Sequence, residues 1–273
     1  MRSSYRIGNV FGIPIRVHIS LLIMVLFLVL DFGVLNGLLI ELGLASSIVL
    51  HELGHSLVAI HKGCRVRGIT LMVIGGAAQM ERIPTRPLDE FLMAVAGPLV
   101  SLALGLLGFF GGGYLPLPEV RPYPVNVVQF VGLINLGLTF FNLLPSFPMD
   151  GGRVLRALLT PRMGRLKATF VAARLGRIMA ICFGLYAFLS RPTKWILVAI
   201  AIFVYIMAGN EYRFVEMQER ARGFGGFDPR ADDAWDGGGN DKVTVGPPPY
   251  SRGRKSKSEI RSAEDDPFDS FGG

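Results

Sequence analysis

The chain has 273 residues, of which 51% are hydrophobic and only 18% are charged, and its net charge is +7. Its two cysteines, Cys64 and Cys182, are too few for a disulfide scaffold. Residues 211–273 hold 13 of the 21 acidic residues and are rich in glycine, whereas long apolar runs fill the part before them. This pattern predicts a polytopic membrane protein in contact with the lipid bilayer. No nucleic-acid partner is expected, because membrane topology itself places positive charge between apolar segments.

Six apolar runs have the length of membrane helices, about 17–25 residues each. They cover residues 18–35, 37–60, 91–111, 127–145, 168–190 and 194–212. Lys and Arg gather before the first run, between the second and third, and between the fourth and fifth, which predicts that both termini are cytoplasmic. We therefore predict an all-α, multi-pass protein of the cell membrane. Its membrane core covers residues 1–213, and a disordered cytoplasmic tail covers residues 214–273.

Residues 64–86 differ from the apolar runs on either side. The β-prone residues Val66, Ile69 and Leu71 are followed by Gly75-Gly76. We predict a short hairpin or re-entrant strand after the second helix. Non-helical backbone at membrane depth is stable only where it packs on protein or lines a cavity, so this stretch is a candidate cavity wall. A plain cytoplasmic loop is the alternative.

The second apolar run contains the sequence His-Glu-Leu-Gly-His at residues 51–55, which fits the pattern H-E-x-x-H. On a helix, His51 and His55 lie one turn apart on the same face, so their imidazole nitrogens can reach one Zn²⁺ ion. Glu52 lies beside them and can take a proton from water at the site. Because ionisable groups are costly in a membrane, the pattern predicts a functional site rather than a helix end with solvated histidines.

A catalytic zinc site needs a third protein ligand. The other acidic residues before residue 211 are expected near the outer face, in basic loops or in an outer loop, and Asp150 remains. It lies in the run NLLPSFPMDGGR at residues 142–153, where two prolines should end the fourth helix and Gly151-Gly152 permits a tight turn. The alternative for Asp150 is a turn residue or a helix N-cap.

The expected depths of the two motifs agree. If the second helix begins near Asn36, His51 lies about 22 Å along it at 1.5 Å per residue. In a core of about 30 Å, His51 is then roughly 8 Å below the inner surface. The fourth helix also runs from the outer to the inner side of the membrane, so Asp150 lies at its inner end. We therefore predict a zinc site formed by His51, His55 and Asp150.

With these motifs, the sequence resembles the site-2 protease family of intramembrane zinc metalloproteases, peptidase family M50, over about residues 7–212. The stretches that carry the likeness are residues 51–55, Gly75-Gly76, Ala96-Gly97-Pro98 and residues 142–153. The resemblance implies a six-helix core with one zinc per chain, bound by His51, His55 and Asp150, and Glu52 as the general base. It implies substrates that are membrane-spanning proteins, cut within or near the bilayer.

The resemblance also implies two substrate contacts. Asn142 would contact the substrate backbone, and the segment with Gly75 and Gly76 would pair with an unwound substrate strand, for which we expect an edge strand at residues 66–76. Many relatives carry a PDZ domain or paired CBS domains, for which the short loops and the polar tail leave no room. Ser101 stands where relatives often have Asn, a difference that we expect to be minor.

Two other classes of function compete with a zinc endopeptidase. A catalytically inactive zinc-binding scaffold would have a fourth protein ligand, and neither Cys64 nor Cys182 is expected near the motif. A metal transporter would have several intramembrane ionisable residues along a path, whereas only His51, Glu52 and His55 are clearly intramembrane. The intact general base favours the enzyme. The pattern does not indicate which substrate is cut or what the oligomeric state is.

Overall fold

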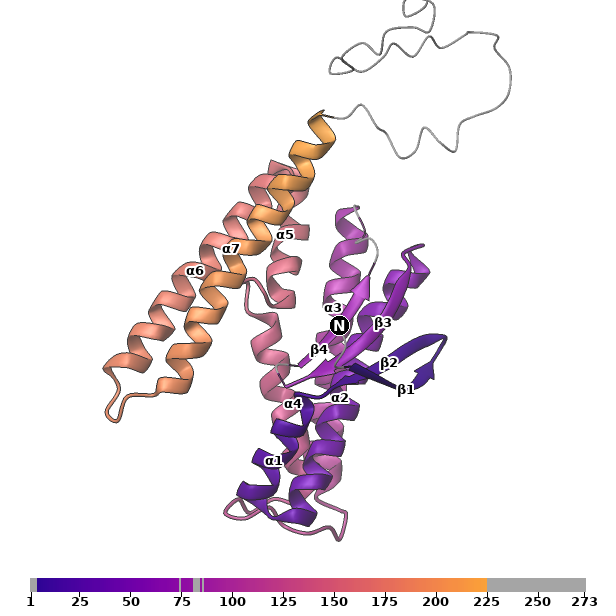
Figure 1. Cartoon of the computed structure of the whole chain (residues 1–273), viewed down its shortest axis with the longest axis vertical. Coiled ribbons are helices and arrows are strands. Elements are labelled where there is room, and N and C mark those ends of the chain that lie inside the picture. The colour runs from indigo at the N-terminus through magenta and orange to yellow at the C-terminus, as the bar shows by residue number, and fades with distance from the viewer. Residues whose placement is uncertain (1–3, 74, 81–83, 85, 225–273) are drawn as a thin grey trace, which may run out of the picture. The chain divides into compact units, whose positions relative to one another are not determined.

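The computed structural model describes residues 4–73, 75–80, 84 and 86–224, with side chains as far as residue 220. This part of the chain is mostly helical and contains one small sheet (Figure 1). The helices that cover the predicted apolar runs are α1 (Leu21–Phe32), α2 (Val34–His61), α3 (Pro87–Leu106), α4 (Val127–Leu143), α6 (Arg165–Leu189) and α7 (Trp195–Phe224). A π-helical turn, η1 (Leu107–Gly111), continues α3, and helix α5 (Asp150–Met163) lies between α4 and α6 in the chain.

Four helices in the described part are long and apolar enough to cross a membrane. They are α2, α3 together with η1, α6, and α7 as far as Arg220. Helices α1 and α4 are apolar but shorter. The prediction of a mainly helical chain with several membrane-spanning helices therefore agrees with the structure. Helix α7 runs on to Phe224, so residues 214–224 of the predicted disordered tail are helical instead, because they continue this helix. Residues 225–273 of the predicted tail lie outside the described residues.

The sheet makes the fold mixed rather than all-α. It has four strands in the order β1 (Ser4–Val10), β2 (Ile13–His18), β3 (Val66–Met72) and β4 (Gly75–Met80). The outer pairs are antiparallel and β2 pairs with β3 in parallel, through the crossover made by α1 and α2. The hairpin predicted after the second helix is β3–β4. The edge strand expected at residues 66–76 is wrong for β3, which lies inside the sheet, whereas Gly75 and Gly76 begin β4, one of the two edge strands.

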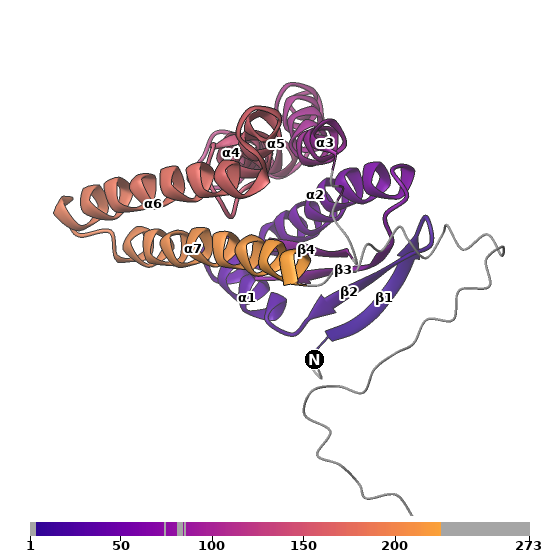
Figure 2. The ribbon, with the colours of Figure 1, turned by 90° about the horizontal axis from the view of Figure 1, so that it is seen from above.

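Hydrophobic packing holds the sheet against α2. Leu53 of α2 forms a buried cluster with Ile13 of β2 and Ile69 of β3. Seen from above, the strands follow one side of α2, while α3 lies on another side (Figure 2). Because Leu53 stands between Glu52 and Gly54 in the motif, this packing fixes how α2 is rotated about its axis. The two histidines then point away from the sheet and Glu52 points towards β4.

A buried ionic cluster ties α5 to its neighbours. Arg156 of α5 is 0% exposed, and its guanidinium donates to Glu90 of α3 over 2.7 Å and to Glu211 of α7 over 2.8 Å. The same guanidinium lies over the ring of Phe147, 5.0 Å from its centre. Buried charges are stable only when they are paired in this way. Glu90, expected in or beside a basic loop, is therefore part of the interior, and the cluster fixes the helix that begins with Asp150.

Candidate metal centre

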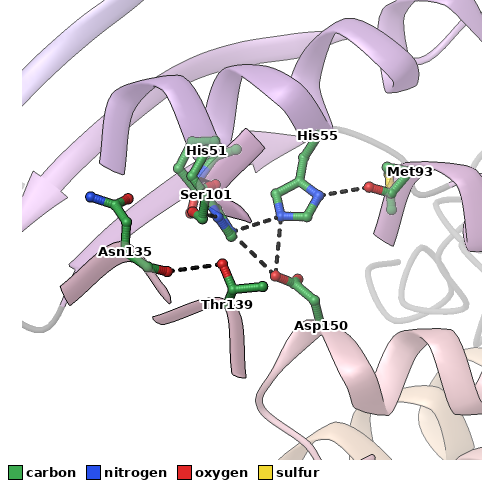
Figure 3. A network of polar contacts seen from close by, with 9 residues as sticks. His51, His55, Met93, Ser101, Asn135, Thr139 and Asp150 are labelled. Carbon is green, nitrogen blue, oxygen red and sulfur yellow. Dashed lines mark hydrogen bonds and ion pairs between the residues drawn. The ribbon is translucent and has the colours of Figure 1, made fainter. Parts of the chain in front are cut away.

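The structure brings His51, His55 and Asp150 together (Figure 3). Oδ2 of Asp150 lies 3.3 Å from Nε2 of His51 and 3.2 Å from Nε2 of His55, and the two Nε2 atoms are 3.1 Å apart. Ligand atoms about 2.0–2.1 Å from a tetrahedral zinc ion lie about 3.3 Å from one another. The residues therefore fit zinc in both chemistry and spacing. Within the described residues, no other group of three His, Cys, Asp or Glu meets this condition.

Hydrogen bonds on the far side of each ring orient both imidazoles. Nδ1 of His55 donates to the carbonyl of Met93 over 2.7 Å, and Nδ1 of His51 is hydrogen-bonded to Oγ of Ser101 at 2.8 Å. An imidazole that donates from Nδ1 keeps the lone pair of Nε2 free to bind a metal. Ser101, expected to be a minor difference from relatives, therefore contacts a candidate ligand directly. Its hydroxyl supplies the contact that fixes the ring of His51.

The carboxylate of Asp150 is held in its ionised form. Burial alone would raise its pKa, but the hydrogen bonds to His51 and His55 and the positive charge of Arg153 lower the pKa well below the usual range of a carboxyl group. Asp150 is also the first residue of α5, where the helix dipole favours negative charge. An ionised carboxylate beside two imidazoles is a donor set typical of zinc sites.

The segment before α5 corrects the expectation of a tight turn at Gly151-Gly152. Met149 holds the N-cap position, so Asp150 is not the cap, and both glycines lie in the first turn of α5. A Cβ atom at Gly151 would lie 2.1 Å from the carbonyl oxygen of Leu144, and one at Gly152 would lie 2.6 Å from the nitrogen of Phe147. The glycines therefore let α5 begin in contact with the chain that precedes it, which brings Asp150 to α2.

Gly97, in the Ala-Gly-Pro stretch of α3, makes room for the two imidazoles. A Cβ atom there would lie 2.2 Å from Nε2 of His55 and 2.7 Å from Nε2 of His51. Helices α2 and α3 also approach closely at Gly54, where a Cβ atom would lie 3.0 Å from the carbonyl oxygen of Ala96. The sequence pattern alone does not reveal this role, because it depends on which helix faces the motif.

Gly97→Ala is expected to weaken zinc binding by about 10- to 100-fold, the range found when ligand orientation is lost. The added methyl group occupies the space of both ligand nitrogens and forces the rings apart. Zinc content of the purified protein after equilibration with a competing chelator measures the effect. Gly137→Ala in α4 is the matched control, because nothing lies within 4 Å of the added Cβ. Equal zinc retention in the two variants would contradict the role of Gly97.

Glu52 faces the edge strand of the sheet. Its Oε2 accepts a hydrogen bond from the backbone N–H of Ala78 in β4, over 3.2 Å. A Cβ atom at Gly76 would lie 2.7 Å from Cγ of Glu52, so the glycine leaves the space that this side chain fills. Gly75 begins β4 beside it. The residue predicted as a base therefore joins the helix that carries the two histidines to the edge strand.

Asn142, the other predicted substrate contact, is half-buried in the last turn of α4. Within the described residues, no hydrogen bond joins it to the histidines or Asp150. One turn earlier on α4, Thr139 donates to the carbonyl of Asn135 (Figure 3). The Asn135 amide donates to Oγ of Ser47 on α2 over 3.0 Å. The hydrogen bond to Ser47 joins α4 to the helix that carries the motif.

Comparison with known proteins identifies similar sequences over this region. The family model described as Peptidase family M50 matches residues 39–121 and 117–185. The chain is 38% identical to the zinc metalloprotease MJ0392 of Methanocaldococcus jannaschii, over 80% of this chain and 63% of that protein. It is 33% identical to the putative zinc metalloprotease sll0528 of Synechocystis, over 82% of this chain and 64% of that protein. The chain thus spans a little under two thirds of the length of these relatives.

A solved structure is similar in both sequence and fold. It is the site-2 protease from Methanocaldococcus jannaschii, to which the chain is 37% identical with a TM-score of 0.59. The match covers 77% of this chain and 95% of that one.

Proposed function

Because the chain belongs to peptidase family M50, we propose that it is an intramembrane zinc endopeptidase that cuts membrane-spanning protein substrates within or near the bilayer. The observation that carries this proposal is the meeting of three ligand atoms, from His51, His55 and Asp150, with Glu52 next to His51 on the same helix. Three protein ligands and a nearby carboxylate are typical of zinc peptidases.

In this proposal each residue of the site has one task. His51, His55 and Asp150 hold one zinc ion, which when bound polarises the scissile carbonyl and makes water at the site more acidic. Ser101 and the carbonyl of Met93 keep the two rings in the orientation that binding requires. Glu52 takes the proton of the attacking water and later gives it to the leaving amine.

The edge strand β4 is the proposed docking strand for the substrate. A helix hides its carbonyl groups in its own hydrogen bonds, so a membrane-spanning substrate must unwind before it is cut. An extended segment can then add to the edge of a sheet through backbone hydrogen bonds. A peptide that pairs with β4 at Gly75 and Gly76 lies beside Glu52, because Gly76 is packed against that side chain. We assign Asn142 a contact with the substrate backbone on the α4 side.

We also propose six membrane segments with both termini in the cytoplasm. The four helices of spanning length are joined by α4, about 26 Å long at 1.5 Å per residue, and by α1, about 18 Å long. A hydrocarbon core of about 30 Å must thin locally or be crossed only in part at α1. Lys and Arg are in excess before the first segment, between the second and third, and between the fourth and fifth, which supports a cytoplasmic orientation of both termini.

Removal of the metal tests the proposed function. The purified chain is reconstituted in vesicles with a panel of tagged single-span membrane peptides, and new peptide ends are identified by mass spectrometry. We expect cuts within or near the apolar span that disappear after treatment with a zinc chelator and return when zinc is added back. Cleavage that continues without zinc would contradict the proposal. Zinc binding without cleavage of any peptide would favour the inactive scaffold.

A further inference from the structure

A cavity between α6 and α7 contains two arginines that the proposed catalysis does not use. It has a volume of about 200 Å³ and is lined by Phe170, Ala173, Arg174, Arg177 and Tyr212. Helix α6 is one of the four helices of spanning length, and Arg174 and Arg177 lie about 14 and 18 Å along it from Arg165. A charged side chain at such a depth is costly, so its presence in an apolar helix indicates a function and calls for a partner.

The two guanidinium groups contact aromatic rings instead of acidic groups. Arg174 lies over Phe170, 6.0 Å from the ring centre, and Arg177 lies over Tyr205 at 5.5 Å. Among the side chains described up to residue 220, no carboxylate forms an ion pair with either arginine, and Nε of Arg177 is buried without a hydrogen-bond partner. Arg156, by contrast, is paired with two glutamates. The cavity therefore carries positive charge that these protein groups leave uncompensated.

Helix α7 is shaped to accept Arg177. A Cβ atom at Gly209 would lie 2.3 Å from Nη2 of Arg177, so the glycine leaves the space that the guanidinium occupies. Side chains on a helix tilt towards its N-terminus, which for α6 is the end with Arg162, Arg165 and Lys167. Arg174, which lies over Phe170 one turn earlier on α6, therefore extends towards the basic end of the helix pair, where the polar headgroups of a bilayer would lie, while Arg177 extends to α7.

We propose that this cavity binds the phosphate group of an anionic phospholipid. A guanidinium pairs with phosphate through two parallel N–H···O bonds, which supply the negative charge and the acceptor that the cavity lacks. Phe170 and Ala173 give the cavity apolar walls that suit the adjoining acyl chain, and the ring of Tyr212 closes it on the α7 side. None of the residues of the metal centre takes part.

The proposed lipid site is next to the loop between α4 and α5, which precedes Asp150. Ala173, which lines the cavity, belongs to the same buried cluster as Phe147, a residue that is 1% exposed, and Tyr212 packs against that cluster. On the same helix, Gly176 lies close to Oγ of Ser146 and to the carbonyl oxygen of Phe147. The cavity and the loop between α4 and α5 therefore share one packed region of the protein.

Native mass spectrometry of the full chain, released from detergent micelles, tests the proposal with phosphatidylglycerol and phosphatidylcholine as probes. We expect the wild-type chain to retain phosphatidylglycerol in clear preference to phosphatidylcholine. Arg177→Gln and, at an exposed position, Arg174→Gln should each lower phosphatidylglycerol occupancy about fivefold. Arg213→Gln is the matched control, because it removes the same charge next to Tyr212 from a side chain that does not line the cavity.

A charge-neutral variant separates this site from general electrostatic attraction. Gly209→Ala keeps every arginine but displaces the Arg177 guanidinium, so it should also lower phosphatidylglycerol binding, while zinc content and elution on size exclusion stay unchanged. Equal retention of the two lipids by the wild-type chain would overturn the proposal. So would undiminished phosphatidylglycerol binding in both Arg174→Gln and Gly209→Ala, or displacement of the lipid by millimolar inorganic phosphate, which would identify a site for the free ion.

Discussion

Glu52→Gln is expected to lower the rate of peptide-bond cleavage by about 10²- to 10⁴-fold, the usual contribution of a general base, while zinc content stays unchanged. Glutamine has the shape of glutamate and its carbonyl oxygen can still accept the hydrogen bond from Ala78 in β4. The edge strand and the metal ligands should therefore keep their places. What is lost is the ability to take a proton from the attacking water.

The measurement is single-turnover cleavage of a membrane-spanning peptide in vesicles, with zinc quantified in the same preparation. Glu119→Gln is the matched control, because Glu119 is an exposed carboxylate in the loop before α4. It should cleave at the wild-type rate. A Glu52→Gln chain that holds zinc and cleaves within a few-fold of wild type would show that another group moves the proton.

Asp150→Ala is expected to reduce zinc from about one ion per chain to a small fraction of that value. The substitution leaves two imidazoles where a catalytic zinc site needs three protein ligands. It also removes the negative charge that faces both Nε2 atoms at 3.2 and 3.3 Å. Elemental analysis of detergent-purified protein, never exposed to a chelator, gives the ratio directly and needs no known substrate.

Two further variants make the zinc measurement specific. Asp31→Ala removes an exposed carboxylate from α1 and should bind zinc as the wild type does. Asp150→Asn keeps the size of the side chain at the start of α5 and should also lose most of its zinc, because a neutral amide is a much weaker ligand. Zinc bound equally by Asp150→Ala and wild type would contradict the ligand assignment. A folded wild-type chain without zinc would favour the inactive scaffold.

The parts of the fold that depend on local sequence were predictable. Each of the six apolar runs forms a helix, because runs of this length and composition satisfy their backbone only as helices in a membrane. His51 and His55 were predictable as a pair because a helix alone sets their spacing. The family resemblance that these motifs indicate is confirmed by the match to peptidase family M50.

The N-terminal hairpin β1–β2 was missed although a signal was present. Ile13, Ile15 and Val17 alternate with other residues, as they do in a strand with one buried face, and the structure buries Ile13 and Ile15. The pattern is only six residues long and runs directly into the apolar run that begins at residue 18. The sheet matters for the site because β4, its edge strand, contacts Glu52.

Other features depend on contacts between distant segments and leave no local trace. Gly97 faces the imidazoles only because α3 packs on α2, and Ser101 reaches His51 one turn further along the same helix. Gly151-Gly152 look like a turn in sequence, yet they serve a close contact at the start of a helix. Such roles follow from tertiary packing, which a pattern in one segment does not contain.

The buried cluster of Arg156, Glu90 and Glu211 has a consequence for how the sequence can change over time. Loss of one partner leaves a buried charge uncompensated, at a cost of about 3–5 kcal/mol, a large share of the stability of an ordinary domain. Replacement of the charged residues together by apolar ones carries no such penalty. We therefore expect the residues at these positions on α3, α5 and α7 to change together in evolution. A substitution at one position alone is destabilising, whereas joint replacement of all three is tolerated.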